Sequence, residues 1–95
     1  MLYRIMNTVK ENERVLKALA NRRRLAIIVF LKKKPEETVN KIAEHIKLSF
    51  TSTSKHLNIL ARADILDKRQ TGLEVYYSIG RSIPSLVEPV IARIL

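Results

Sequence analysis

VNKIAEHIKLSFTSTSKHLNILARADILDKRQTGLEVYYSI, residues 39–79, is the stretch that decides the fold of this 95-residue chain. Apolar residues recur at helical spacing in its first eight positions, which predicts a short helix whose buried face carries Val39, Ile42, Ala43 and Ile46. Thr38 is the candidate N-cap of this helix, with an earlier start at Glu36 as the alternative. After a short break at Leu48, Ser49 is a good N-cap residue, and we expect a second helix to begin there.

The second expected helix has two contrasting sides. Its buried side carries Thr53, Leu57 and Leu60. The roughly opposite side carries hydroxyl, amide and cationic groups, from Thr51, Lys55, Asn58 and Arg62, with Ser54 flanking. A helix of this kind is suited to the DNA major groove, where such groups contact base edges and phosphates. Amphipathic helices also carry such residues simply because they face water, so this helix alone leaves both interpretations open.

The residues that follow predict a β-hairpin. Ile65 and Leu66 lead into the polar run 68–70, Thr71 and Gly72 supply the turn, and the β-branched and aromatic run 75–77 returns. Two closely spaced helices followed by a hairpin predict a winged helix-turn-helix. We therefore expect a mainly α fold with a small β-hairpin (α+β): about five helices, a helix-turn-helix over 38–62 and a two-stranded wing over 65–79.

Composition limits the possible partners. Ninety-five residues predict one domain, and a formal net charge of +9 indicates a polyanionic partner, most simply nucleic acid. An anionic membrane surface or an acidic protein would also match this charge. No apolar run approaches the roughly 20 residues that span a bilayer, and the N-terminal residues lack signal-peptide features, so we expect a cytoplasmic protein. The absence of cysteine excludes disulfides, thiolate metal sites and cysteine nucleophiles.

Two helices are expected before the helix-turn-helix. The first begins at Thr8 with a Thr8–Glu11 capping box, ends near Ala20 and buries Val15, Leu16 and Leu19. The second spans 22–33 with Asn21 as its N-cap and buries Leu25, Ile28 and Val29, with Leu31 as a further candidate. Arginines crowd its first turn, where the helix dipole is positive. We expect Arg24 to be paired within the chain, with Glu11 or Glu13 as candidate partners.

Both ends of the chain are apolar. A last helix is expected after the loop that follows the hairpin, with Pro89 at a kink or at the first helical position. The terminal apolar side chains either cover the chain's own core or form a dimer interface built from 1–20 and 83–95. The interface candidates are Leu2, Ile5, Met6, Val9, Val90, Ile91, Ile94 and Leu95.

Three stretches together resemble one family. They are LKALANRRRLAII (16–28), IAEHIKLSFTSTSKHLNILARADIL (42–66) and VYYSI (75–79), which cover about two thirds of the chain. The chain looks like the ArsR class of winged helix-turn-helix repressors. The resemblance implies a homodimer whose outer helices form the interface and which binds an imperfect palindrome in an operator. Each recognition helix would enter a major groove, and each wing would touch neighbouring backbone or minor groove.

The chain departs from the family pattern at several positions. Lys47 and Asp64 stand where glycine is common, and Phe50 stands where a polar base-reading residue is frequent. Phe50 could touch a thymine methyl, or fold back onto Leu48 or the wing. Family metal sensors use cysteines on the first helix of the motif, or Asp and His on the last helix. Residues 39–45 contain no Cys and residues 85–95 no Asp or His, so we expect neither a metal site nor a cofactor. Whether a small-molecule effector exists stays open.

We predict a DNA-binding transcriptional repressor. The expected base contacts are Thr51, Ser54, Lys55 and Asn58, and the expected phosphate contacts are Ser49, Ser52, Arg62, Lys68, Arg69, Lys41 and Lys47. One alternative is an architectural protein that coats DNA with little sequence preference, and another is a winged helix used for protein contacts. An enzyme is not expected, because the chain has no glycine-rich phosphate loop, no paired carboxylates in an apolar setting and no nucleophile with a plausible base.

Overall fold

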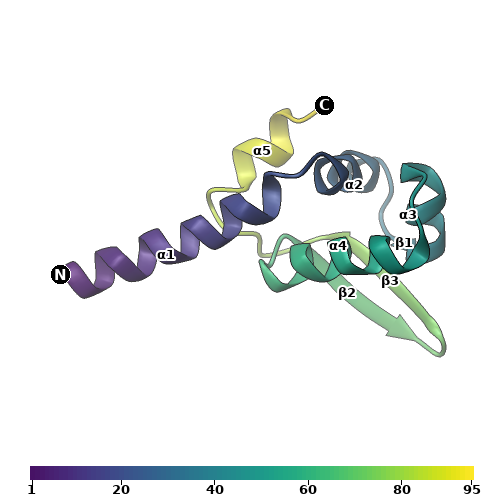
Figure 1. Ribbon diagram of the computed structural model, residues 1–95, viewed down its shortest axis with the longest axis horizontal. Helices are drawn as coiled ribbons and strands as arrows, with labels where there is room; N and C mark the ends of the chain where they lie inside the picture. The colour runs from purple at the N-terminus through teal and green to yellow at the C-terminus, as the bar shows by residue number, and fades with distance from the viewer.

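The computed structural model describes all 95 residues and contains five helices and three short strands (Figure 1). In chain order these are α1 (Leu2–Leu19), α2 (Arg22–Lys32), β1 (Glu37–Thr38), α3 (Val39–Ile46), α4 (Phe50–Arg62), β2 (Leu66–Thr71), β3 (Glu74–Ile79) and α5 (Glu88–Arg93). The predicted fold class, a mainly α winged helix-turn-helix, is confirmed. None of these helices has the length and apolar character that crossing a membrane requires.

The wing is larger than the two-stranded hairpin that the sequence predicted. β2 and β3 form the expected antiparallel hairpin, with Thr71 opposite Glu74 across the turn at Gly72, whose φ is +60°. A third strand, β1, pairs with the other edge of β3 and places Glu37 opposite Tyr77. The prediction missed β1 because a two-residue strand has no alternation to detect, and only its distant partner makes it a strand.

Three helices begin at the N-cap residues that the sequence indicated. The Asn21 side chain accepts hydrogen bonds from the backbone N–H groups of Arg23 (2.9 Å) and Arg24 (3.1 Å). Thr38 and Ser49 cap α3 and α4 in the same way, each accepting from the N–H three residues ahead. These bonds satisfy N–H groups that have no partner inside the helix.

The expected start of the first helix is wrong. α1 begins at Leu2 rather than Thr8, and the predicted capping box does not form. Thr8 lies inside the helix, where its hydroxyl donates to the Arg4 carbonyl oxygen (3.1 Å), as hydroxyls in helix interiors commonly do. The last helix also begins one residue earlier than the proline suggested, with Glu88 first and Pro89 second.

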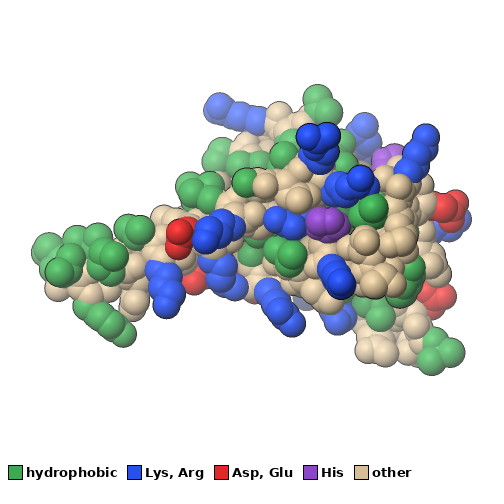
Figure 2. All heavy atoms as spheres, in the orientation of Figure 1, with side chains coloured by type: hydrophobic (Ala, Val, Ile, Leu, Met, Phe, Trp, Pro, Cys, Tyr) green, Lys and Arg blue, Asp and Glu red, His purple; other side chains and the backbone are tan.

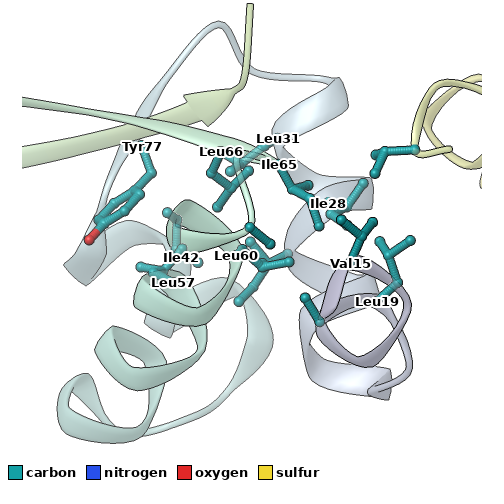
Figure 3. Close-up of a cluster of buried hydrophobic side chains, with 14 of the residues drawn as sticks. Val15, Leu19, Ile28, Leu31, Ile42, Leu57, Leu60, Ile65, Leu66 and Tyr77 are labelled. Carbon is teal, nitrogen blue, oxygen red and sulfur yellow. The ribbon is translucent and has the colours of Figure 1, made fainter. Parts of the chain in front are cut away.

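The core lies where α1, α2, α3 and α4 meet the base of the wing (Figure 3). Its fully buried side chains include Val15, Ile28, Ile42, Leu57, Leu60 and Ile65. Two predictions about burial are wrong. Leu16 is 51% exposed because it lies about 100° around α1 from Val15, at the edge of the face that packs on the core. In α2, Ile27 is buried, whereas Leu25 and Val29 are only half-buried.

The molecule is elongated, with principal extents of 45 × 29 × 22 Å. Figure 1 shows the reason: the N-terminal half of α1 projects away from the other elements, while α5 lies beside α2. Every residue of α1 before Val15 is exposed. The helix-turn-helix and the wing therefore form one end of the molecule, and the free half of α1 forms the other.

Candidate nucleic-acid interface

The outer side of α4 presents polar groups from a firmly packed helix. Thr53, Leu57 and Leu60 are fully buried beneath it, and Ser49 caps its N-terminus by accepting from the N–H of Ser52 (3.1 Å). Of the expected base-contact residues, Thr51, Lys55 and Asn58 are exposed and Ser54 is half-buried at the flank. The N-terminal turns of a recognition helix are the part that contacts base edges in helix-turn-helix proteins.

A hydrogen bond from the wing positions the Asn58 side chain. Its Oδ1 accepts a hydrogen bond from the hydroxyl of Tyr77 on β3, at 3.4 Å. Tyr77 is almost fully buried, and burial raises the pKa of its hydroxyl, so the phenol stays protonated as a donor. The contact leaves the Asn58 amide NH₂ group, and one oxygen lone pair, available on the exposed side. This contact could not be predicted from the sequence, because it depends on how the wing packs against α4.

Four of the five cations expected to contact phosphates, and Lys55 among the expected base contacts, are exposed and make no ion pair. They are Lys41, Lys47, Lys55, Arg62 and Lys68. Figure 2 shows blue Lys and Arg side chains spread over the body of the molecule with few red carboxylates among them. The other two expected phosphate contacts, Ser49 and Ser52, lie at the first turn of α4, exposed and half-buried respectively. This part of the surface can attract a polyanion without first breaking internal pairs.

Arg69 is the exception among these cations. Its Nε and Nη2 donate to both carboxylate oxygens of Glu36 (3.1 and 2.6 Å), its Nη1 donates to the Thr71 hydroxyl, and its guanidinium lies 4.8 Å from the Tyr76 ring centroid. The hydrogen bond from Arg69 lowers the pKa of the Glu36 carboxyl below its ordinary value. Arg69 therefore links β2 to the segment before β1 and braces the wing.

A second arginine joins three helices, and the sequence predicted its intramolecular role but not its partners. From the first turn of α2, the Arg24 guanidinium donates to the carbonyl oxygens of Ala18 (2.6 Å) and Lys17 (3.1 Å), at the end of α1. Its Nη1 lies 3.1 Å from Nδ1 of His56 on α4. The expected acids are committed elsewhere, since Glu11 pairs with Arg14 and Glu13 with Lys17.

His56 accepts from Arg24 only when its Nδ1 is unprotonated. Burial, and then the charges of Arg24 and Arg23, lower the pKa of His56 below its ordinary value. The neutral ring can accept at Nδ1 and carry its proton on Nε2. The side chain is half-buried on the flank of α4 that faces α2.

The expected dimer residues divide into two groups. On α1, Leu2, Ile5, Met6 and Val9 are at least half exposed. At the C-terminus, Val90, Ile91 and Ile94 are partly buried against the core, and Leu95 is exposed. The structure thus leaves the α1 residues outside the core and at least half exposed, and gives most of the C-terminal ones a share in the chain's own core. No group of three or more His, Asp or Glu side chains lies close enough together to hold a metal ion.

Comparison with known proteins gives consistent matches. The model of a family described as "Bacterial regulatory protein, arsR family" matches residues 21–68. The transcriptional repressor SdpR of Bacillus subtilis (strain 168) is 36% identical over 69 residues, which are 73% of this chain and 76% of that protein. The transcriptional repressor PagR of Bacillus anthracis is 31% identical over 87 residues, 87% of each chain.

Solved structures match over nearly the whole chain. The crystal structure of PagR has a TM-score of 0.76 and 30% identity, covering 95% of this chain and 99% of that one. The homodimeric winged helix-turn-helix DNA-binding domain of Mb0332 from Mycobacterium bovis, described as a possible ArsR-family transcriptional regulator, has a TM-score of 0.78 and 31% identity. That match covers 92% of this chain and 77% of the other.

Proposed function

Because the chain belongs to the arsR family of bacterial regulatory proteins, and is therefore a DNA-binding transcriptional regulator and not an enzyme, we propose that it is a homodimeric repressor. In this proposal the dimer binds a palindromic operator in the cytoplasm and blocks access to a promoter. It works without a metal-sensing site or a cofactor. The observation that carries the proposal is the exposed hydrogen-bonding side of α4 beside unpaired cations on a winged helix.

The proposal gives α4 the role of recognition helix. A B-DNA major groove, about 12 Å wide, admits one α-helix. Thr51, Ser54, Lys55 and Asn58 would contact base edges there. Asn58 is pre-oriented by Tyr77, so less side-chain freedom is lost when it binds a base. Ser49, Ser52, Arg62, Lys41 and Lys47 would bind the flanking phosphates.

The wing would supply further phosphate contacts. Lys68 is exposed and unpaired, so it is ready to bind a phosphate. Arg69 would have to share its guanidinium with Glu36, or release the carboxylate, before it could do the same. We therefore rank Lys68 ahead of Arg69 as a phosphate contact and keep Arg69 in the proposal as a secondary one.

The proposed homodimer is supported by the exposed residues of α1 and by the structurally similar domain of Mb0332. The exposed apolar residues of α1 need a partner surface, and the structurally similar domain of Mb0332 is described as homodimeric. The sequence matches to SdpR and PagR support repression over activation, since both of those proteins are described as transcriptional repressors.

The test is a binding titration of the full chain against duplex DNA from upstream of its own gene and against a scrambled duplex, at two salt concentrations. A preference of about a thousandfold or more at physiological salt is expected for a specific regulator. Near-equal affinities for every duplex tried, with a steep dependence on salt, would instead favour a protein that coats DNA without sequence preference. The same unpaired cations would bind phosphates in that case too. Absence of binding to any duplex would contradict both functions.

Two variants distinguish contacts with bases from contacts with phosphates. Asn58→Ala is expected to cost roughly 1–3 kcal/mol on the preferred sequence and to relax the preference at one base pair. Lys68→Ala is expected to weaken binding to every sequence alike and to reduce the salt slope by about one. If Asn58→Ala weakened all sequences equally, the base contact would be excluded.

A further inference from the structure

Phe50, the first residue of α4, is an aromatic side chain left in solvent. It is 55% exposed, although it lies on the same helix turn as the buried side chain of Thr53. It is not among the side chains of the core or those packed against it. An exposed large apolar side chain matters when it lies on a surface that must bind something.

Phe50 forms part of a cleft between α4 and the wing. The cleft has a volume of about 200 Å³ and is lined by Phe50, Thr38, Val39, Asn40, Leu73, Glu74 and Val75. Its apolar walls come from the start of α3, the start of α4 and the tip of the hairpin. Phe50 stands between the exposed residues Ser49 and Thr51 in the chain, so the cleft lies at the N-terminal turn of α4, which the proposed function places against DNA.

DNA presents one apolar group in the major groove, the C5 methyl of thymine, and phenylalanine is among the side chains that contact it. The other base edges offer hydrogen-bond donors and acceptors, none of which Phe50 can pair. A phosphate is an unsuitable occupant, because Glu74 lines the cleft and carries a negative charge. A methyl group is small enough for the space, and its burial against the ring removes apolar surface of both partners from water.

We propose that Phe50 is a specificity-determining residue that selects thymine in the operator by packing against the C5 methyl at the mouth of this cleft. The inference rests on the proposed function, since it needs a specific operator. It adds an apolar contact to the polar readers Thr51, Ser54, Lys55 and Asn58. The operator half-site should then contain a thymine whose methyl, and not its hydrogen-bonding groups, is what the protein recognises there.

The experiment first selects binding sequences for the full chain from a random-sequence duplex library. Each thymine of the enriched half-site is then replaced in turn by deoxyuridine, which removes only the methyl group. Removal of one buried methyl is expected to weaken wild-type binding about fourfold at one position. Phe50→Ala should bind the thymine and deoxyuridine duplexes equally at that position, whereas Phe50→Leu, which stays apolar, should keep most of the difference.

Ile59→Ala is the matched control, because Ile59 is the other exposed large apolar side chain of α4 and lies more than two turns from Phe50. This variant should keep the methyl dependence at the Phe50 position. Circular dichroism and the affinity for unrelated duplex DNA show whether each variant still folds.

Three outcomes overturn the proposal. Selection of a sequence in which no thymine methyl matters removes the Phe50 contact but leaves the regulator function standing. Methyl dependence that survives in Phe50→Ala assigns the methyl to another residue, and its loss in Leu73→Ala would identify the wing tip. Failure to enrich any sequence contradicts the specific-repressor function itself and the inference with it.

Discussion

At the scale of single residues, Arg24 is the side chain on which the most elements depend. It lies in the first turn of α2, binds two carbonyl oxygens at the end of α1 and approaches His56 on α4. Those carbonyls belong to the last turn of α1, where helix C=O groups lack partners and carry partial negative charge. One guanidinium thus satisfies the end of α1 and fixes the position of α4 relative to it. The cost of a cation at the start of α2 is offset by these contacts.

Replacing Arg24 with lysine tests this role while keeping the charge. An ammonium cannot supply the planar fork that reaches three acceptors at once. Arg24→Lys is expected to lower the free energy of unfolding by about 2 kcal/mol, the size of one or two charged hydrogen bonds. The measurement is urea unfolding at one fixed protein concentration. Arg23→Lys is the control, since that exposed side chain makes no hydrogen bond, and equal losses in the two variants would contradict the role given to Arg24.

His56 is expected to make stability depend on pH. Because its pKa in the folded chain is lowered, the unfolded chain binds a proton first as pH falls. The contribution of His56 is therefore complete above its unfolded pKa of about 6.5 and is lost as pH falls through its lower, folded value. Urea unfolding at pH 7.5 and 5.5 should show this loss, and His56→Gln should reduce it.

Two other titratable residues, His45 and Glu36, serve as controls for this pH effect. His45→Gln should keep the loss, because His45 stacks on Phe30 and lies away from Arg24. The carboxyl of Glu36, whose pKa is also lowered, contributes its own loss only at more acidic pH, below its ordinary value near 4.5. An unchanged difference between pH 7.5 and 5.5 in His56→Gln would show that other groups carry the effect.

At the scale of elements, two left-handed residues end helices where glycine would be unstrained. Lys47 closes α3 with φ of 56°, and Asp64 follows α4 with φ of 61°. Lys47→Gly is expected to raise the free energy of unfolding by up to about 1 kcal/mol, because a side chain in this conformation is strained. The same change should lower the salt slope of DNA binding by about one if Lys47 binds a phosphate.

Asp64→Gly is the matched change for that experiment. It relieves the same kind of backbone strain without removing a cation, so it should not lower the salt slope. A salt slope unchanged in Lys47→Gly would remove Lys47 from the proposed phosphate contacts. A loss of stability in both variants would mean that the greater freedom of glycine in the unfolded chain outweighs the strain.

The elements that sequence could predict are those specified by local signals. Asn21, Thr38 and Ser49 were identified as caps because an N-cap bonds to N–H groups two or three residues away. Lys47 and Asp64 were singled out by the family resemblance, as positions where glycine is common, and both have positive φ. β1 was missed because its pairing with Tyr76 and Tyr77 spans about forty residues of sequence. The partners of Arg24 and of Asn58 were missed for the same reason, since they exist only after α1, α4 and the wing have packed.

At the scale of the whole molecule, α1 is the part that the fold alone does not explain. Its free half exposes a run of apolar side chains, and Figure 2 shows them gathered as a green cluster at the end of the projecting helix. The sequence placed these residues in a candidate interface but also buried Leu16, which belongs to the same exposed side as Val9. That error came from assigning all the apolar residues of α1 to one buried face. In the structure one apolar face packs on the core, and a second apolar face is turned outward.

Val9→Glu tests whether this outward face joins two protomers. Glutamate in the middle of an apolar seam would be a buried, unpaired charge, and its desolvation is expected to prevent association. Sedimentation velocity should give the wild type about twice its 11.0 kDa chain mass and Val9→Glu the mass of one chain. Asn7→Glu adds the same charge on the opposite side of α1 and should leave the dimer intact.

Val9→Glu should also bind an operator with two half-sites more weakly than Asn7→Glu does, because the two recognition helices are then on separate chains and are no longer held at a fixed spacing. A wild type that sediments as one chain while binding such an operator would contradict the dimer, and a Val9→Glu variant that stays dimeric would move the interface away from α1.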